Sequence, residues 1–174
     1  MTRAELARAI TQRSLITGEF LLRSGAISHE YFDKYLFESD PALLRAVAEA
    51  LAPLVPEGVD ALAGLELGGV PLAVMLGQVT GLPTLFVRKQ AKEYGTRRLA
   101  EGGEVAGRRL LVVEDVVTSG GQVVLSTHDL KERGASVTHA LCVIDREAGG
   151  AQALAAEGVE LRALFSMSEL KAAG

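Results

Sequence analysis

Cysteine and tryptophan are almost or wholly absent from this chain of 174 residues, which has one cysteine, Cys142, and no tryptophan. A single cysteine cannot form an internal disulfide, so the chain lies outside the disulfide-rich secreted class and suits a reducing cytosol. Cys142 lies in an apolar run, which indicates a buried, inert thiol and not a nucleophile or a metal ligand.

Long apolar runs and a strong charge of one sign are also absent. No run approaches the length of a membrane-spanning helix, and the charged N-terminal residues do not form a signal peptide. The formal net charge of -4 gives no general attraction to nucleic acid or to anionic membranes. We therefore expect a cytoplasmic protein that binds neither. The length favours a single domain over residues 1–174.

The order of apolar and turn-forming stretches predicts an α/β fold. We expect helices over residues 4–16 and 70–79, a third beginning at Asp40-Pro41, a fourth from about Gln122 to Gly134, and a hairpin over 20–33. Expected strands cover residues 59–65, 83–87, 110–113, 137–144 and 161–165. Strands that alternate with helices predict a parallel sheet with helices on both faces, although the strand order stays open.

The most informative stretch covers residues 110–122. Four aliphatic residues precede Glu114 and Asp115, and a small polar and glycine turn, 118–121, leads into the helix at Gln122. A glycine turn at a helix N-terminus can bind a phosphate through backbone amides, and two carboxylates beside it can accept hydrogen bonds from sugar hydroxyls. The stretch therefore predicts a site for a phosphorylated sugar, although a buried strand with a solvated acidic turn is a simpler alternative. The sequence has no Walker A motif and no GxGxxG fingerprint.

The string Glu-Asp-Val-Val-Thr-Ser-Gly-Gly closely resembles the signature by which type I phosphoribosyltransferases bind 5-phosphoribosyl 1-diphosphate (PRPP). The resemblance implies a Rossmann-like parallel sheet flanked by helices, with a small N-terminal hood over about residues 1–38. It also implies that Glu114 and Asp115 hold the ribose hydroxyls. The remaining PRPP contacts that it implies are Val116, Val117, Thr118, Ser119, Gly120, Gly121 and Gln122.

A second informative stretch covers residues 88–104. Five basic residues and one acid lie between Arg88 and Arg98, in a segment longer than most βα connections and without apolar periodicity. Such charge runs are often only solvated surface, but long basic loops also serve as binding loops. The segment closely matches the mobile catalytic loop of orotate phosphoribosyltransferases. By that resemblance Arg88, Lys89 and Lys92 contact pyrophosphate, while Tyr94 stands where that family commonly has histidine.

Three further matches to the same family concern the acceptor base and the leaving group. The hairpin at 20–33 resembles the family's N-terminal segment, although a purely structural hairpin also explains it. The turn at 64–69 resembles the loop that handles pyrophosphate, with Gly68 where some relatives have lysine, so backbone amides would act there. Arg146 follows the strand at 137–144, where a guanidinium can grip a carboxylate. The orotate contacts that the resemblance implies are Arg23, Tyr31, Phe32, Thr118 and Arg146.

Together these motifs resemble an orotate phosphoribosyltransferase of pyrimidine (UMP) biosynthesis. The implied reaction joins orotate to PRPP and yields orotidine 5′-monophosphate and pyrophosphate. The resemblance implies Mg²⁺ held mainly by PRPP, and a homodimer whose loops are shared between active sites. A phosphoribosyltransferase for another nucleobase and a non-catalytic PRPP-sensing regulator stay open as alternatives. The catalytic residues implied are Arg88, Lys89, Lys92 and Asp115.

Overall fold

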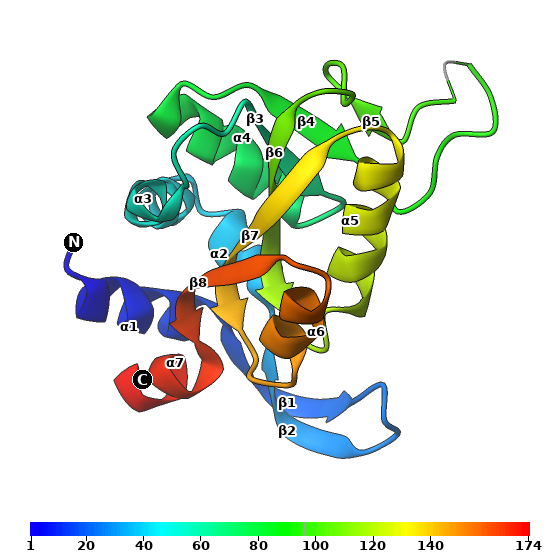
Figure 1. Cartoon of the computed structure of the whole chain (residues 1–174). Coiled ribbons are helices and arrows are strands. Elements are labelled where there is room, and N and C mark those ends of the chain that lie inside the picture. Colours follow the sequence, from blue (N-terminus) through cyan, green and yellow to red (C-terminus); the bar gives the residue numbers. More distant parts are fainter. Residues whose placement is uncertain (96) are drawn as a thin grey trace.

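A six-stranded sheet forms the centre of the computed structural model, which describes residues 1–95 and 97–174 (Figure 1). The strand order is β5-β4-β3-β6-β7-β8, and every neighbouring pair is parallel except β4 with β5. The prediction of a parallel sheet is therefore confirmed. The strands are β3 (Ala61–Leu65), β4 (Thr84–Val87), β5 (Ala100–Glu101), β6 (Arg109–Val117), β7 (Ser136–Asp145) and β8 (Glu160–Ser166).

Helices cover both faces of this sheet (Figure 1). Alternate strand residues point to opposite faces: Leu111 and Val113 of β6 join one buried cluster, and Leu110 and Val112 join the other. Burial on both sides explains the continuous aliphatic run that begins β6. The first cluster packs against α1 (Arg3–Ser14), α3 (Pro41–Leu51), α4 (Gly69–Thr80) and α7 (Met167–Ala173); the second packs against α5 (Gly121–Glu132) and α6 (Gly150–Ala156).

The helix boundaries follow from local chemistry. The Asp40 carboxylate accepts hydrogen bonds from the backbone amides of Ala42 and Leu43, and Pro41 occupies the first turn of α3, as expected. A 3-10 turn (Ala52–Leu54) follows that helix. Helix α4 ends at Gly81, whose φ of 77° suits glycine. No helix in the described part of the chain is long and apolar enough to cross a membrane.

The N-terminal hood is an antiparallel hairpin of β1 (Leu15–Leu21) and β2 (Ile27–Phe32), which projects beside the main sheet (Figure 1). The Ser-Gly turn between its strands is confirmed, and Gly25 has a φ of 84°. Strand β1 begins one residue after α1 ends, so the helix expected to reach residue 16 is shorter than predicted. A short helix, α2 (Lys34–Glu38), follows the hairpin and was not expected.

Two predicted boundaries near the motifs were wrong. The two acids were expected to end the strand, but β6 continues through Val116 and Val117, so Glu114 and Asp115 lie within it. The segment 88–104 also contains strand β5, where Ala100 pairs with Val87 of β4. Two buried residues, Leu99 and Ala100, suffice to anchor this edge strand but are too few to produce a periodic pattern. Residue 96 of the predicted loop lies outside the described residues.

Candidate active site

The loops that follow β3, β4, β6 and β7 meet at one edge of the sheet, because neighbouring parallel strands end on the same side. The backbone amide of Arg146 donates to the Val117 carbonyl at 2.9 Å, which places the end of β7 beside the end of β6. The amide of Glu66 donates to the Val87 carbonyl at 2.9 Å on the other side. Motifs that are far apart in the sequence therefore share one edge.

The turn between β6 and α5 forms a glycine-lined cradle. Thr118 and Ser119 are exposed, and Gly120 has a φ of 80° at the start of α5. A Cβ on Gly120 would lie 3.1 Å from backbone atoms of Gly150, so this close contact with α6 needs glycine. No side chain caps the first turn of α5. Its amides and the positive end of the helix dipole are therefore available to an anion.

Asp115 lies next to this cradle and is completely buried, with an exposed fraction of 0%. Its Oδ2 atom lies 2.6 Å from Nζ of Lys34, a residue of α2. Its Oδ1 atom accepts a hydrogen bond from the Val116 amide at 2.6 Å. A Cβ on Gly68 would lie 1.7 Å from Oδ2, so no side chain fits at that position in this arrangement. Backbone of the β3–α4 loop thus packs directly on the carboxylate.

Three acids lie around Lys34, and the structure shifts their pKa values in different directions. Burial, followed by the charge of Asp115, raises the pKa of Glu114 to about 8. Burial is also the main reason that the pKa of Glu38 rises to about 9, with Asp115 as the second cause. For Asp115 the effect of burial is outweighed by hydrogen bonding, first from Lys34, so its pKa falls below the ordinary value. Near neutral pH the cluster therefore holds one carboxylate, paired with one ammonium.

Lys34 and Glu38 were missed by the sequence analysis. They lie four residues apart on α2, a spacing that places two side chains on one helix face. A helix of five residues leaves no periodic pattern, and its contact with Asp115 is made across the fold. Lysine and glutamate at that spacing are also common on solvated helices, so the sequence carried no distinguishing signal.

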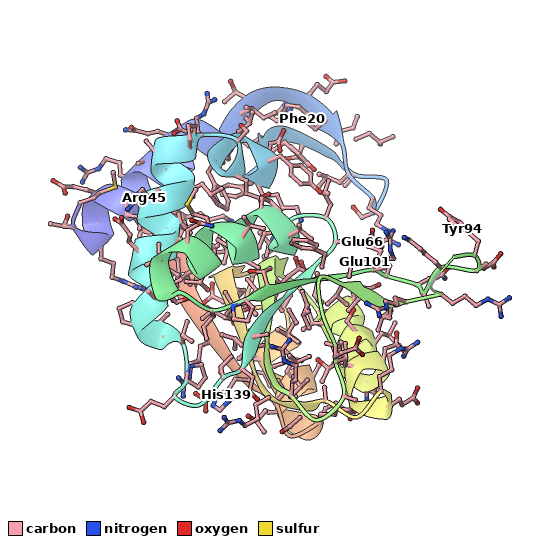
Figure 2. The ribbon with its side chains drawn as sticks, turned by 90° about the horizontal axis from the view of Figure 1, so that it is seen from above. Phe20, Arg45, Glu66, Tyr94, Glu101 and His139 are labelled. Atoms are coloured by element: carbon pink, nitrogen blue, oxygen red, sulfur yellow. The ribbon has the colours of Figure 1, made fainter. Side chains whose placement is uncertain are left out.

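The basic segment extends from the sheet edge as a long loop. Figure 2 shows Glu66 and Glu101 together at its base and Tyr94 at its far tip, where the tyrosine is 75% exposed. Nζ of Lys92 lies 2.8 Å from Oε1 of Glu101, and the Arg88 guanidinium lies 3.7 Å from the same oxygen. The structure thus brings Arg88 and Lys92 together. Hydrogen bonding from Lys92 is the main reason that the pKa of Glu101 is lowered.

Lys89 is separated from these two cations. Its side chain is exposed, and its backbone amide donates to the Glu66 carboxylate of the β3–α4 loop. That hydrogen bond ties the start of the basic loop to the segment that packs on Asp115.

The residues expected to bind orotate lie in two places. Arg146 is exposed directly after β7, beside the cradle, and Arg23 is exposed in the turn of the hood. The rings of Tyr31 and Phe20 lie 5.5 Å apart, and Tyr31 is half-exposed. Phe32 packs against the main core instead. Because neighbours in a strand point to opposite faces, Tyr31 and Phe32 do not share one surface.

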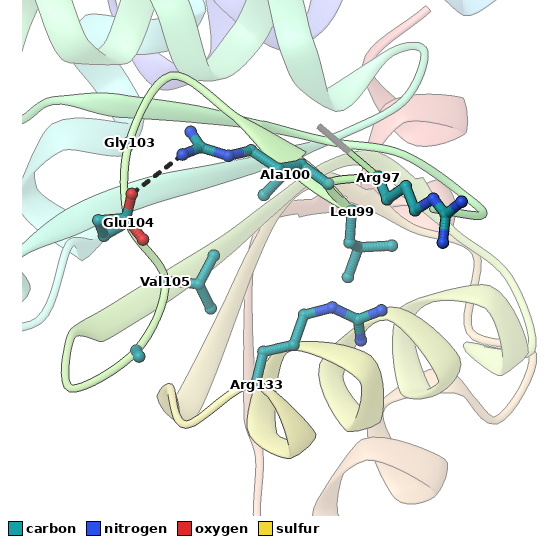
Figure 3. Close-up of a pocket in the computed structure, with 9 residues that line it drawn as sticks. Arg97, Leu99, Ala100, Gly103, Glu104, Val105 and Arg133 are labelled. Atoms are coloured by element: carbon teal, nitrogen blue, oxygen red, sulfur yellow. Dashed lines mark hydrogen bonds and ion pairs between the residues drawn. The ribbon is translucent and has the colours of Figure 1, made fainter. Parts of the chain in front are cut away.

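A surface pocket of about 250 Å³ lies apart from these residues. Figure 3 shows it between the end of the 88–104 segment and Arg133, the residue that follows α5. Nη2 of Arg98 lies 3.2 Å from Oε1 of Glu104 there. None of the predicted site residues lines it. It is therefore not the site built on Asp115.

The sheet edge offers a cradle for phosphate, one ionised carboxylate and a cationic loop, which together suit a phosphorylated sugar with an anionic leaving group. In the described part of the chain, no group of three or more histidine, cysteine, aspartate or glutamate residues is arranged to hold a metal ion. A metal ion that arrives with its ligands already supplied by a phosphorylated substrate fits this donor set.

Comparisons with known proteins agree with this chemistry. The family described as "Phosphoribosyl transferase domain" matches residues 37–157. An orotate phosphoribosyltransferase from a Nocardioides species is 52% identical over 170 residues, which cover 98% of this chain and 95% of the relative. The crystal structure of Mycobacterium tuberculosis orotate phosphoribosyltransferase with PRPP aligns with a TM-score of 0.84 and 29% identity, over 97% and 98% of the two chains. The same enzyme with inorganic phosphate gives 0.87 and 30%, with the same coverage.

Proposed function

This chain belongs to the orotate phosphoribosyltransferases of the phosphoribosyltransferase family, and we propose how its own residues perform the reaction. The enzyme transfers the 5-phosphoribosyl group from PRPP to orotate, giving orotidine 5′-monophosphate and pyrophosphate in pyrimidine biosynthesis. The observation that carries our assignment of residues is the buried Asp115 carboxylate, paired with Lys34 beside the uncapped first turn of α5.

The PRPP half of the site is the segment from Glu114 to Gln122. Backbone amides of the cradle bind the 5′-phosphate, and the Asp115 carboxylate accepts hydrogen bonds from the ribose hydroxyls. Glu114 is protonated near neutral pH and adds a second, uncharged group on the same strand. The other PRPP contacts that we propose in this segment are Val116, Val117, Thr118, Ser119, Gly120, Gly121 and Gln122.

The leaving-group half is the basic loop. As the bond between C1 of the ribose and pyrophosphate breaks, negative charge accumulates on pyrophosphate, and cations aimed at that charge lower the barrier. Arg88, Lys89 and Lys92 supply them. Arg88 and Lys92 both lie beside Glu101, whereas Lys89 is exposed apart from them. Pyrophosphate takes the place of the Glu101 carboxylate as the partner of Arg88 and Lys92.

PRPP would carry Mg²⁺ into this site. The metal would neutralise charge that develops on the pyrophosphate. The protein residues orient PRPP around it, because no group of acidic or histidine ligands in the described residues is arranged as a metal cage.

Orotate lies between the cradle and the hood. Arg146 grips the orotate carboxylate, because a guanidinium binds a carboxylate through two parallel hydrogen bonds. Thr118 contacts the base from the cradle, and Arg23 reaches it from the hood. The half-exposed ring of Tyr31 stacks on the pyrimidine, while Phe32 supports the hood from the core side.

A homodimer whose basic loops reach the partner's site accounts for the length of the loop and for the exposure of its tip. We also infer a single domain over residues 1–174, located in the cytoplasm. The part of the segment 88–104 that precedes β5 is the mobile catalytic loop. Mixing Lys92→Ala subunits with Asp115→Asn subunits tests the shared site. In an equal mixture about half of the dimers are hybrids with one intact site of two, so recovery of up to about a quarter of wild-type activity supports the shared site and no recovery refutes it.

Base specificity is tested by mixing the enzyme, Mg²⁺ and PRPP with orotate, uracil, adenine or hypoxanthine and following pyrophosphate release. We expect release with orotate and little with the other bases, because Arg146 has a carboxylate partner only in orotate. Release with another base and none with orotate would refute the assignment.

A further inference from the structure

We propose that Lys34 and Glu38 of α2 are positioning residues that fix the Asp115 carboxylate for the ribose hydroxyls of PRPP, with Glu38 donating a hydrogen bond to it. This inference rests on the function proposed above for Asp115. It assigns a catalytic task to α2, a helix that carries none of the motifs found in the sequence.

The geometry holds Asp115 from three directions. Lys34 approaches Oδ2 at 2.6 Å, the Val116 amide donates to Oδ1 at 2.6 Å, and backbone at Gly68 packs against Oδ2. With Oδ1 hydrogen-bonded and Oδ2 in an ion pair, the carboxylate has little freedom to rotate. Its orientation is fixed before the substrate arrives, and displacement of the Gly68 backbone would expose it to the ribose hydroxyls.

Glu38 is the least explained group in this cluster. Its side chain is only 7% exposed, and neither carboxylate oxygen accepts a hydrogen bond from any described residue. A buried carboxylate without donors is costly, and the cost disappears if the group carries a proton and donates it to an acceptor. We assign Asp115 as that acceptor, because after burial it is the main group that raises the pKa of Glu38.

The charges agree with this arrangement. Burial, then Asp115, raises the pKa of Glu38 to about 9, so Glu38 is neutral near pH 7. Hydrogen bonds from Lys34, Glu114 and Glu38 together outweigh burial and lower the pKa of Asp115. The proton therefore belongs to Glu38 and the negative charge to Asp115.

Helix α2 also connects this carboxylate to the hood. It follows β2 after one residue, Asp33, whose side chain caps the helix by accepting from the Tyr35 amide at 3.1 Å. The Asp33 amide in turn donates to the Ser14 carbonyl at the end of α1. Lys34 and Glu38 are therefore held in place by the same hairpin that carries Tyr31.

The test compares Glu38→Leu with Glu38→Gln. Glutamine keeps the size and an N–H donor, whereas leucine keeps the approximate volume without a donor. We expect PRPP with Mg²⁺, titrated calorimetrically in the absence of orotate, to bind Glu38→Leu about tenfold more weakly than wild type, equivalent to about 1.4 kcal/mol. Glu38→Gln should bind within about twofold of wild type, because a neutral donor is retained.

Two further readouts separate positioning from a structural role. The KM for PRPP should rise in Glu38→Leu while the KM for orotate stays unchanged. The Tm of Glu38→Leu should fall only modestly, because burial of an apolar side chain partly offsets the lost hydrogen bond to Asp115. Lys34→Met provides a second variant if leucine prevents folding, and it should weaken PRPP binding by at least as much.

Wild-type PRPP affinity in Glu38→Leu, or in Lys34→Met when leucine prevents folding, would overturn the proposal. Equal weakening in Glu38→Leu and Glu38→Gln would overturn the role of the donated hydrogen bond. Failure of the proposed function is recognised separately. It would appear as no orotate-dependent pyrophosphate release by wild-type enzyme, whereas PRPP binding is measured without any base.

Discussion

The buried cluster around Asp115 and the exposed basic loop handle the two ends of one substrate in opposite ways. Asp115 is fixed by Lys34, Val116 and Gly68 before any ligand binds. Arg88 and Lys92 share one acceptor, Glu101, in ion pairs that are partly open to solvent. A carboxylate that binds the ribose throughout the reaction, such as Asp115, binds better when its orientation is fixed. Cations that stabilise charge formed only during bond cleavage, such as Arg88 and Lys92, must be able to exchange Glu101 for pyrophosphate.

The largest expected effect is a loss of turnover when a cation of the basic loop is removed. Lys92→Ala should lower kcat by about 10² to 10³, the usual cost of removing one donor from a developing anion. Its Tm should change little, because Lys92 makes only a partly exposed ion pair. Steady-state kinetics with orotate and PRPP give the result, with Arg45→Ala on α3 as a control for the loss of a surface cation. A turnover number equal to that of wild type would remove the loop from the mechanism.

A smaller effect is expected on the pH dependence of stability, through Glu38 in the buried cluster around Asp115. Glu38 keeps its proton in the folded enzyme up to about pH 9 but ionises near 4.5 when unfolded. Its contribution to the free energy of unfolding is therefore complete below about pH 4.5 and is lost as the pH rises toward 9. Glutamine does not titrate, so Glu38→Gln does not lose this part of its free energy of unfolding as the pH rises. Lys34, Glu114 and Asp115 are present in both proteins, so their titration affects both.

The difference in Tm between Glu38→Gln and wild type should consequently become more positive from pH 5 to pH 9. Thermal melts of both proteins across that range measure it. A difference that stays constant, or that falls with pH, would mean that Glu38 is ionised in the folded enzyme.

The smallest effect is expected at Glu101. Surface ion pairs contribute about 0 to 1 kcal/mol, so Glu101→Gln should tighten pyrophosphate binding by no more than about fivefold. The direction follows because Arg88 and Lys92 lose a competing carboxylate. Product inhibition by pyrophosphate measures the change. Binding weakened tenfold would instead show that Glu101 holds the two cations in their productive positions.

Much of the fold could be predicted because its signals are local. The aliphatic start of β6, the Asp40-Pro41 cap and Gly81 each specify a boundary through nearby residues. Helix α2 and strand β5 could not be predicted, because five and two residues are too short for a periodic pattern. Their stability comes from tertiary contacts.

The residues of the candidate site also fall into those that local sequence predicts and those that only tertiary contacts bring together. The glycine cradle and the basic loop are continuous stretches of sequence, and the predicted residues of both lie at one sheet edge. Lys34 and Glu38 reach Asp115 only after the chain has folded. The sequence assigned both Glu114 and Asp115 to the ribose hydroxyls and gave no physical reason for a difference in their ionisation. Burial and the single lysine decide which one is ionised, and neither is visible in a motif.

The most direct test of this division of labour is calorimetric titration of PRPP with Mg²⁺ into Lys92→Ala and Asp115→Asn, without orotate. Asp115→Asn should bind PRPP at least about tenfold more weakly than wild type, because charged hydrogen bonds contribute about 1.5 to 3 kcal/mol. Lys92→Ala should bind PRPP within about threefold of wild type although its turnover is severely reduced. Strong PRPP binding by Asp115→Asn, together with weak binding by Lys92→Ala, would contradict the account.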